Sequence, residues 1–377
     1  MLSANSSIEE TELVDGAVAW LNGSLPSGWA AERSTWRIVG PNGREPTVID
    51  PTIDLRGSNT TATFVVEARP SLSPRDVELL MAGLSRTLRT VARVSVLVVA
   101  PWLSARTQEV LRAEEINYVD LTGNAWIRSE QPAVFISSVG ATRNPQPAQR
   151  EPVRLRGAKA GRLVRTLIDV APPYGVRELA TATGLNPGYV SRLLDALDKE
   201  ALVDRSGRGE VSGVDYSGLL LRWTEAYQVF KSNEVSRFIA PEGAAQVLTK
   251  VAPLAARGRF AVTGSFAAVR RSPVAAPALL AAYVEDLSPV AAALNLLPAD
   301  EGANVVLLRP FDNAVWERLE ADDGIAYVAP SQVVADCLTG TGRMPAEGQA
   351  LLAWMSENET LWRVPSLATV TGSDQLP

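Results

Sequence analysis

The chain of 377 residues has no histidine and a single cysteine, Cys337. Without histidine, neither a Ser-His-Asp nor a Cys-His catalytic arrangement can form, and zinc sites built on cysteine and histidine are excluded. Only carboxylates remain as metal ligands. One cysteine cannot form an intrachain disulfide, and its apolar surroundings, VVADCL, predict a small buried hydrophobic side chain.

Long hydrophobic runs are also missing. No stretch approaches about 20 apolar residues, and the N-terminus lacks a charged segment followed by an apolar one. We therefore expect neither export nor contact with a membrane, and predict a cytoplasmic protein. Lysine is scarce whereas arginine and alanine are abundant, a usage typical of GC-rich bacterial coding sequence.

The formal charge of -6 is unfavourable for a protein that binds nucleic acid, because phosphate neutralisation supplies most non-specific affinity. The charge is unevenly distributed, however. From Arg143 to Arg165 there are seven basic residues and one acid, Glu151, a local balance of +6. The linker part of this segment is either a phosphate-binding stretch or simply solvated. For Lys159 and Arg162, which follow it, we expect phosphate contact.

Residues 176–205 have the pattern of a helix-turn-helix. Gly184 lies at the turn, where a positive φ is required. Asn186 can cap the second helix, and Pro187 suits its first turn because no N–H is needed there. The alternative is a helical hairpin within a larger core, but turn, cap and spacing agree in favouring DNA binding. The apolar residues that two such helices would bury are Leu179, Ala180, Leu185, Val190 and Leu193.

The segment that follows predicts a wing. Apolar residues at 202–203 and 211–214 flank a Gly-rich turn, 204–209, that contains two arginines. We expect the second helix to enter the major groove of double-stranded DNA and the wing to lie along phosphates. The expected base-reading residues are Tyr189, Ser191 and Arg192, and the other expected DNA contacts are Asn186, Arg177, Lys159, Arg162, Arg205 and Arg208.

Residues 1–142 predict a small α/β domain, which a basic, Pro-rich linker at 143–156 separates from the winged helix-turn-helix at 157–225. Apolar periodicity predicts an αβββαβ order. The expected elements are a helix near 8–22, strands near 34–40, 48–55 and 62–69, a helix near 74–91, a strand near 94–100 and a helix near 104–115.

This region resembles the PD-(D/E)XK nuclease-like, or restriction-endonuclease-like, fold. Asp54 in PTIDLRG matches the first acid of that family, and Glu67-Ala68-Arg69 matches its second motif. The resemblance implies that the two acids hold a divalent cation. Arg69 departs from the family's lysine, and a permanently protonated guanidinium cannot act as a base. We therefore expect an inactive relative in which Asp54 and Glu67 are the candidate metal ligands; the alternative is that Glu67 and Arg69 form a same-face ion pair.

A second polar cluster, residues 117–124, follows a predicted strand. It either lines a binding pocket or forms a turn stabilised by the side chains of Asp120 and Asn124.

Residues 226–377 predict a further α/β domain. Thr263-Gly264-Ser265 resembles the Gly-Ser turn of nucleotidyltransferases, which also need two acids spaced i, i+2 on the next strand. Here Glu285 and Asp286 are adjacent and so lie on opposite faces of a strand, which excludes that chemistry.

The stretch 157–365 is similar to AbiEi-type regulators, the antitoxin halves of type IV toxin–antitoxin systems, in its helix-turn-helix and in AVTGSFAA, NVVLLRPFD and SQVVADCLTGTGR. The resemblance implies a winged helix joined to an α/β domain, and a transcriptional regulator that binds DNA repeats. The long N-terminal domain departs from it.

We therefore predict a multidomain α/β and α+β transcriptional regulator that binds DNA as a homodimer. We expect no cofactor and no catalytic residue, and an unidentified effector at the flanking domains stays open. The alternatives are a metal-dependent DNA nuclease directed by the winged helix, and an antitoxin.

Overall fold

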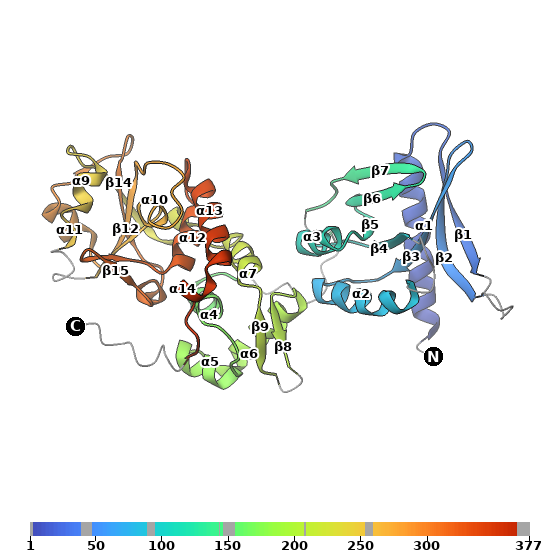
Figure 1. Ribbon diagram of the computed structural model, residues 1–377, viewed down its shortest axis with the longest axis horizontal. Helices are drawn as coiled ribbons and strands as arrows, with labels where there is room; N and C mark the ends of the chain where they lie inside the picture. Colours follow the sequence, from blue (N-terminus) through green and yellow to red (C-terminus); the bar gives the residue numbers. More distant parts are fainter. Residues whose placement is uncertain are drawn as a thin grey trace. The chain divides into compact units, whose positions relative to one another are not determined.

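The computed structural model describes residues 3–38, 47–88, 95–142, 144–145, 155–206, 209–252 and 259–367. The chain forms two compact units, both of mixed α/β structure (Figure 1). The first comprises Met1–Glu151 and Lys199–Ala201, and the second comprises Pro152–Asp198 and Leu202–Pro377. Two segments that we expected to be separate domains, 157–225 and 226–377, therefore share the second unit. Within the described ranges, no helix combines the length and apolar character needed to cross a bilayer.

The first unit is built on a seven-stranded sheet whose strands follow chain order from β1 to β7. The strands β3, β4 and β5 run parallel, and the other neighbouring pairs are antiparallel. The elements begin in the predicted αβββαβ order. They are α1 (Ser3–Ser24), β1 (Ala30–Ile38), β2 (Thr47–Arg56), β3 (Thr61–Ala68), α2 (Pro74–Leu88), β4 (Ser95–Ala100), α3 (Ala105–Ala113), β5 (Asn117–Asp120), β6 (Ala125–Glu130) and β7 (Ala133–Ser138).

Each face of this sheet is covered by helices. On one face, Val14 and Leu21 of α1 pack against a buried cluster that includes Phe64. On the other, residues of α2 and α3 such as Val77 and Leu111 pack against a second cluster. Alternate residues of β4 belong to each cluster, which explains why this strand is apolar throughout.

The second unit begins with the elements of the segment predicted as a winged helix-turn-helix, α4 (Ala158–Asp169), α5 (Val176–Thr183), α6 (Pro187–Lys199), β8 (Val203–Arg205), β9 (Val211–Val214) and α7 (Tyr216–Thr224). The α/β part that follows has a seven-stranded sheet in the order β13-β10-β14-β12-β11-β16-β15. Its elements are α8 (Val229–Ser232), β10 (Glu234–Ile239), α9 (Ala244–Leu248), β11 (Phe260–Thr263), α10 (Ser265–Ala268), β12 (Leu280–Val284), α11 (Leu287–Ala293), β13 (Leu297–Pro298), β14 (Val305–Arg309), the 3-10 helix η2 (Asn313–Trp316), β15 (Glu320–Asp322), β16 (Ile325–Tyr327), α12 (Pro330–Leu338), α13 (Met344–Glu357) and α14 (Glu359–Trp362).

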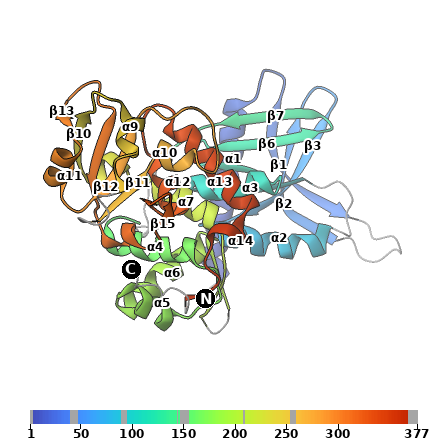
Figure 2. The ribbon, with the colours of Figure 1, turned by 60° about the vertical axis from the view of Figure 1, so that its left-hand side comes forward.

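One hydrophobic cluster runs through both parts of this unit, from Leu155 to Met355. In Figures 1 and 2, helices α4, α5 and α6 lie at one end of the unit, below the sheet. Gly161 of α4 lets the helix approach its neighbours, because a Cβ atom there would come within 3.0 Å of the Phe311 ring. The segment from α4 to α7 is therefore packed directly on the α/β part.

A buried ionic cluster also joins the two parts. Arg165 of α4 is 1% exposed, and its Nε and Nη2 both donate to the Asp169 carboxylate at 3.1 Å. Its Nη1 donates to Gln332 of α12 at 2.6 Å, and Arg318 donates to Asp169 at 2.7 Å. Burial raises the pKa of the Asp169 carboxyl, but the two guanidinium groups outweigh it and hold that pKa below its ordinary value.

Candidate nucleic-acid interface

The turn between α5 and α6 has the predicted geometry. Gly184 adopts a left-handed conformation with φ 66°, and its N–H donates to the end of α5. The side-chain oxygen of Asn186 accepts the Gly188 N–H at 2.9 Å, so Asn186 caps α6, and Pro187 is the first residue of that helix. The start of α6 is thus fixed by local chemistry.

The faces of α6 differ sharply. Val190, Leu193, Leu194 and Leu197 are buried, whereas the exposed positions follow helical spacing at Gly188, Arg192, Asp195 and Lys199. Arg192 is the exposed member of the expected base-reading trio. Tyr189 and Ser191 are half-buried, and burial raises the pKa of the Tyr189 hydroxyl. The side chain most available to a DNA base is therefore that of Arg192.

The wing is a two-stranded antiparallel ribbon in which β8 pairs with β9. Arg205 forms an ion pair with Asp195 of α6, and its Nη2 donates to the Gly209 carbonyl at 3.2 Å. In the structure Arg205 thus joins the ribbon to the exposed face of α6, and its predicted DNA contact stays a prediction. Arg208 lies outside the described residues.

Arg162 also has partners within the protein. Its Nε and Nη2 donate to Asp312 at 3.1 and 2.6 Å, and its Nη1 donates to the Thr183 carbonyl at 3.1 Å. The hydrogen bond with Asp312 raises the pKa of the guanidinium. In the structure this side chain connects α4, the end of α5 and the residue before η2, and its predicted phosphate contact stays a prediction. The other predicted basic contacts, Lys159 and Arg177, are exposed.

The two candidate metal ligands of the first unit do not converge. Asp54 stands opposite Thr63, whose hydroxyl it accepts at 2.7 Å, and Glu67 lies four residues further along β3. At a strand's rise per residue this places the two acids about 13 Å apart, too far to share one ion. In the described part of the chain, no group of three acidic or cysteine side chains could hold a metal.

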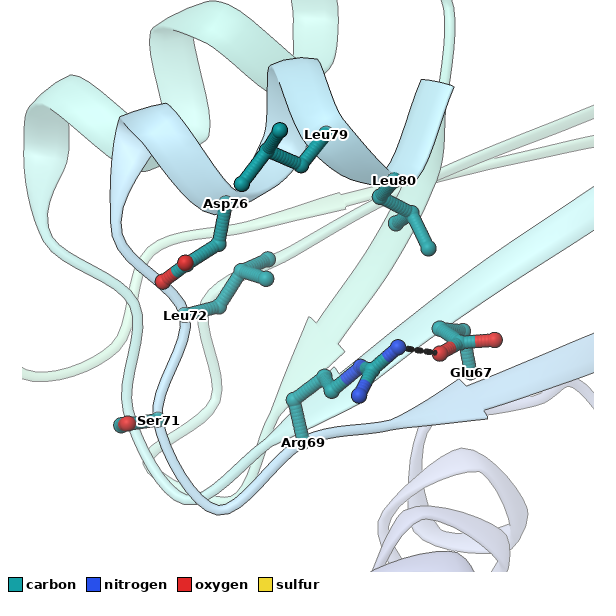
Figure 3. A pocket seen from close by; sticks show the side chains of 7 residues that line it. All are labelled: Glu67, Arg69, Ser71, Leu72, Asp76, Leu79 and Leu80. Atoms are coloured by element: carbon teal, nitrogen blue, oxygen red, sulfur yellow. Dashed lines mark ion pairs between the residues drawn. The ribbon is translucent and has the colours of Figure 1, made fainter. Parts of the chain in front are cut away.

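Glu67 and Arg69 instead form an ion pair at the rim of an open pocket of about 590 Å³ (Figure 3). Leu72, Leu79 and Leu80 form its apolar wall, and Asp76 points away from the ion pair. The Asp76 carboxylate accepts hydrogen bonds from the N–H and hydroxyl of Ser73 at 2.8 and 2.7 Å, which fixes the start of α2. The acids of the pocket thus have partners within the protein.

Of the two alternatives for residues 117–124, the structure has the turn. Asp120 is 0% exposed, and its carboxylate accepts hydrogen bonds from the N–H groups of Leu103, Thr122 and Asn124. It also accepts from the Thr122 hydroxyl at 2.7 Å and the Asn124 amide at 2.8 Å. With five donors the carboxylate is satisfied, so its role is structural.

Asp120→Asn is expected to lower the free energy of unfolding of the first unit by about 1–3 kcal/mol, because an amide nitrogen would face donors that need an acceptor. Thermal denaturation combined with hydrogen exchange in 117–124 measures the effect. Asp15→Asn, at an exposed position of α1, is the matched control. Equal stability of the two variants would contradict the structural role.

Sequence reasoning missed the buried carboxylate of Asp336, which lies in the apolar run VVADCL. Asp336 accepts hydrogen bonds from the hydroxyls of Tyr227 and Thr263 at 2.6 Å, and from Tyr283 at 3.0 Å. Burial raises its pKa, and these hydrogen bonds oppose that effect. It is 0% exposed and enclosed by its partners, so it specifies packing.

The Gly-Ser turn before α10 is also a packing feature. Ser265 is buried and its hydroxyl donates to Glu347, while α10 has only four residues.

Neither protein-family models nor curated proteins match this chain.

Proposed function

We propose that the protein is a sequence-specific DNA-binding transcriptional regulator that acts through its winged helix-turn-helix. The observation that carries this proposal is the open start of α6. The Asn186 cap and, one to two turns further along, the Arg192 side chain are exposed, while the opposite face of the helix is buried. A helix held in this way can enter a major groove, where a guanidinium binds guanine O6 and N7 in a bidentate manner.

Exposed basic residues on the helices around α6 support contact with the phosphate backbone of DNA. Lys159 in the first turn of α4 and Arg177 in the first turn of α5 are both exposed. Arg205 neutralises Asp195, the one acid on the exposed face of α6. Because the whole chain carries a formal charge of -6, we expect weak non-specific binding and strong dependence on base contacts.

The regulatory role rests on the resemblance to AbiEi-type regulators and stays a prediction, as does the antitoxin alternative. No observation favours the nuclease alternative, because Asp54 and Glu67 lie far apart along the sheet.

Fluorescence anisotropy with labelled duplex and single-stranded DNA tests the proposal. We expect the protein to bind duplex more tightly than single strands, with an affinity that falls as the salt concentration rises. We also expect unlabelled duplex that carries a selected site to displace the labelled duplex far better than random duplex does. Equal binding of duplex and single strands, or no binding at low salt, would contradict it.

Lys159→Ala is expected to weaken binding to all duplexes alike, and to reduce the slope of log K against log salt by about 1. The reason is that a phosphate contact neutralises charge without reading sequence. Lys231→Ala, at an exposed position of α8, is the matched control and should leave the slope unchanged. A sequence-dependent loss for Lys159→Ala would instead make this lysine a base contact.

A further inference from the structure

The two seven-stranded sheets have four edges, and three of these edges carry the features that prevent edge-to-edge pairing. The edge strand β1 contains Glu32, Arg33 and Arg37 and has a register shift between Ser34 and Trp36. In the second unit, β13 has two residues, and β15 has three, two of them acidic. Charge, bulges and short length are the usual means by which proteins protect a strand edge.

The fourth edge, β7, has none of these features. It pairs with β6 over six successive residues without a register shift, and its sequence, AVFISS, is uncharged. Val134 and Ile136 pack against the buried cluster below α1, while Phe135 is 68% exposed and Val139, just beyond the strand, is 82% exposed. Figure 1 shows β7 at the outer edge of the sheet, and no described strand pairs with its other side.

We propose that β7 pairs antiparallel with β7 of a second copy of this chain, so that the two seven-stranded sheets join across a two-fold axis. The uncharged strand suits pairing with itself, since no like charges meet across the axis. If the two-fold axis is perpendicular to the sheet, the same face of each copy lies on the same side of the joined sheet. It places Phe135 opposite Phe135 of the second copy, where the two exposed rings cover each other.

This inference deepens the proposed function, because sequence-specific operators are usually bound by two helix-turn-helix modules in one dimer. The pairing itself does not depend on DNA. Its failure is therefore distinguishable from failure of the proposed function.

Sedimentation velocity of the full chain without DNA tests the pairing. We expect a dimer for the native chain and at least a tenfold higher dissociation constant for Phe135→Lys. In that variant the two introduced lysines, one from each copy, would face each other in the shared sheet. Leu79→Lys, which replaces an equally exposed leucine of α2 in the same unit, is the matched control and should stay dimeric. Thermal melts check that both variants fold.

A second variant locates the contact. Directly opposed residues in an antiparallel pair have Cα atoms about 4.5–5.5 Å apart, within the range of a disulfide. Phe135→Cys is thus expected to form a covalent dimer under mild oxidation, whereas Leu79→Cys should not. The native Cys337 is buried and does not interfere. A monomer at all concentrations, or a dimer unaffected by Phe135→Lys and not cross-linked through residue 135, would overturn the inference.

Discussion

Arg165→Leu is expected to lower the free energy of unfolding of the second unit by about 3–5 kcal/mol. The substitution removes one guanidinium from a buried cluster, so that the buried negative charge of the Asp169 carboxylate is less well compensated. It also removes the hydrogen bond to Gln332, which joins α4 to α12 of the α/β part. Urea denaturation measures the change in the free energy of unfolding, and any loss of cooperativity between the two parts would change the m-value.

Arg309→Leu is the matched control. Arg309 forms an ion pair with Glu234 at 3.0 Å, the two side chains are 47% and 57% exposed, and such surface pairs contribute at most about 1 kcal/mol. If both variants lost the same small amount of stability, the buried cluster would not hold the unit together.

Acid provides an independent readout of the same cluster. The pKa of Asp169 is held below its ordinary value in the folded protein, so its contribution is present above the unfolded-state pKa. That contribution is lost as the pH falls through the folded-state pKa. The stability difference between the native chain and Arg165→Leu should therefore shrink at acid pH.

Arg192→Ala is expected to reduce affinity for a specific duplex by about 1–3 kcal/mol, and to change random duplex much less. The reason is that Arg192 is the exposed member of the three residues of α6 that we predict to read bases, so that its loss should remove discrimination at one base pair. Competition assays with specific and random duplexes measure it. Lys159→Ala supplies the comparison, because a phosphate contact is lost equally on every sequence. An equal loss on all duplexes for Arg192→Ala would contradict base reading.

Local chemistry explains which parts of this structure were predictable. Some features depend only on neighbouring residues and are found where the sequence predicts them. These are the turn at Gly184, the Asn186 cap and the strand β4, whose residues are apolar on both faces of the sheet. Strand β1 begins earlier than predicted because Ala30 pairs with Arg56 of β2, a contact that alternation along one strand does not reveal.

Long-range partners explain the rest. Arg162 and Arg165 counted equally in the basic stretch ahead of the helix-turn-helix, yet their partners Asp312 and Gln332 lie 150 and 167 residues away. A partner at that separation cannot be found from the residues that neighbour each arginine along the chain. The strand register likewise sets Asp54 opposite Thr63 rather than near Glu67, which no spacing along one strand can show.

Selection from a random duplex pool tests DNA recognition by α6 most directly. The native chain and Arg192→Ala would each be put through the same rounds, and the recovered sequences compared. We predict that the native chain enriches one sequence motif, with a two-fold repeat if it binds as a homodimer, and that Arg192→Ala loses preference at one position in each half. Recovery of no motif by the native chain, or of the same motif with the same preference by Arg192→Ala, would contradict recognition through this helix.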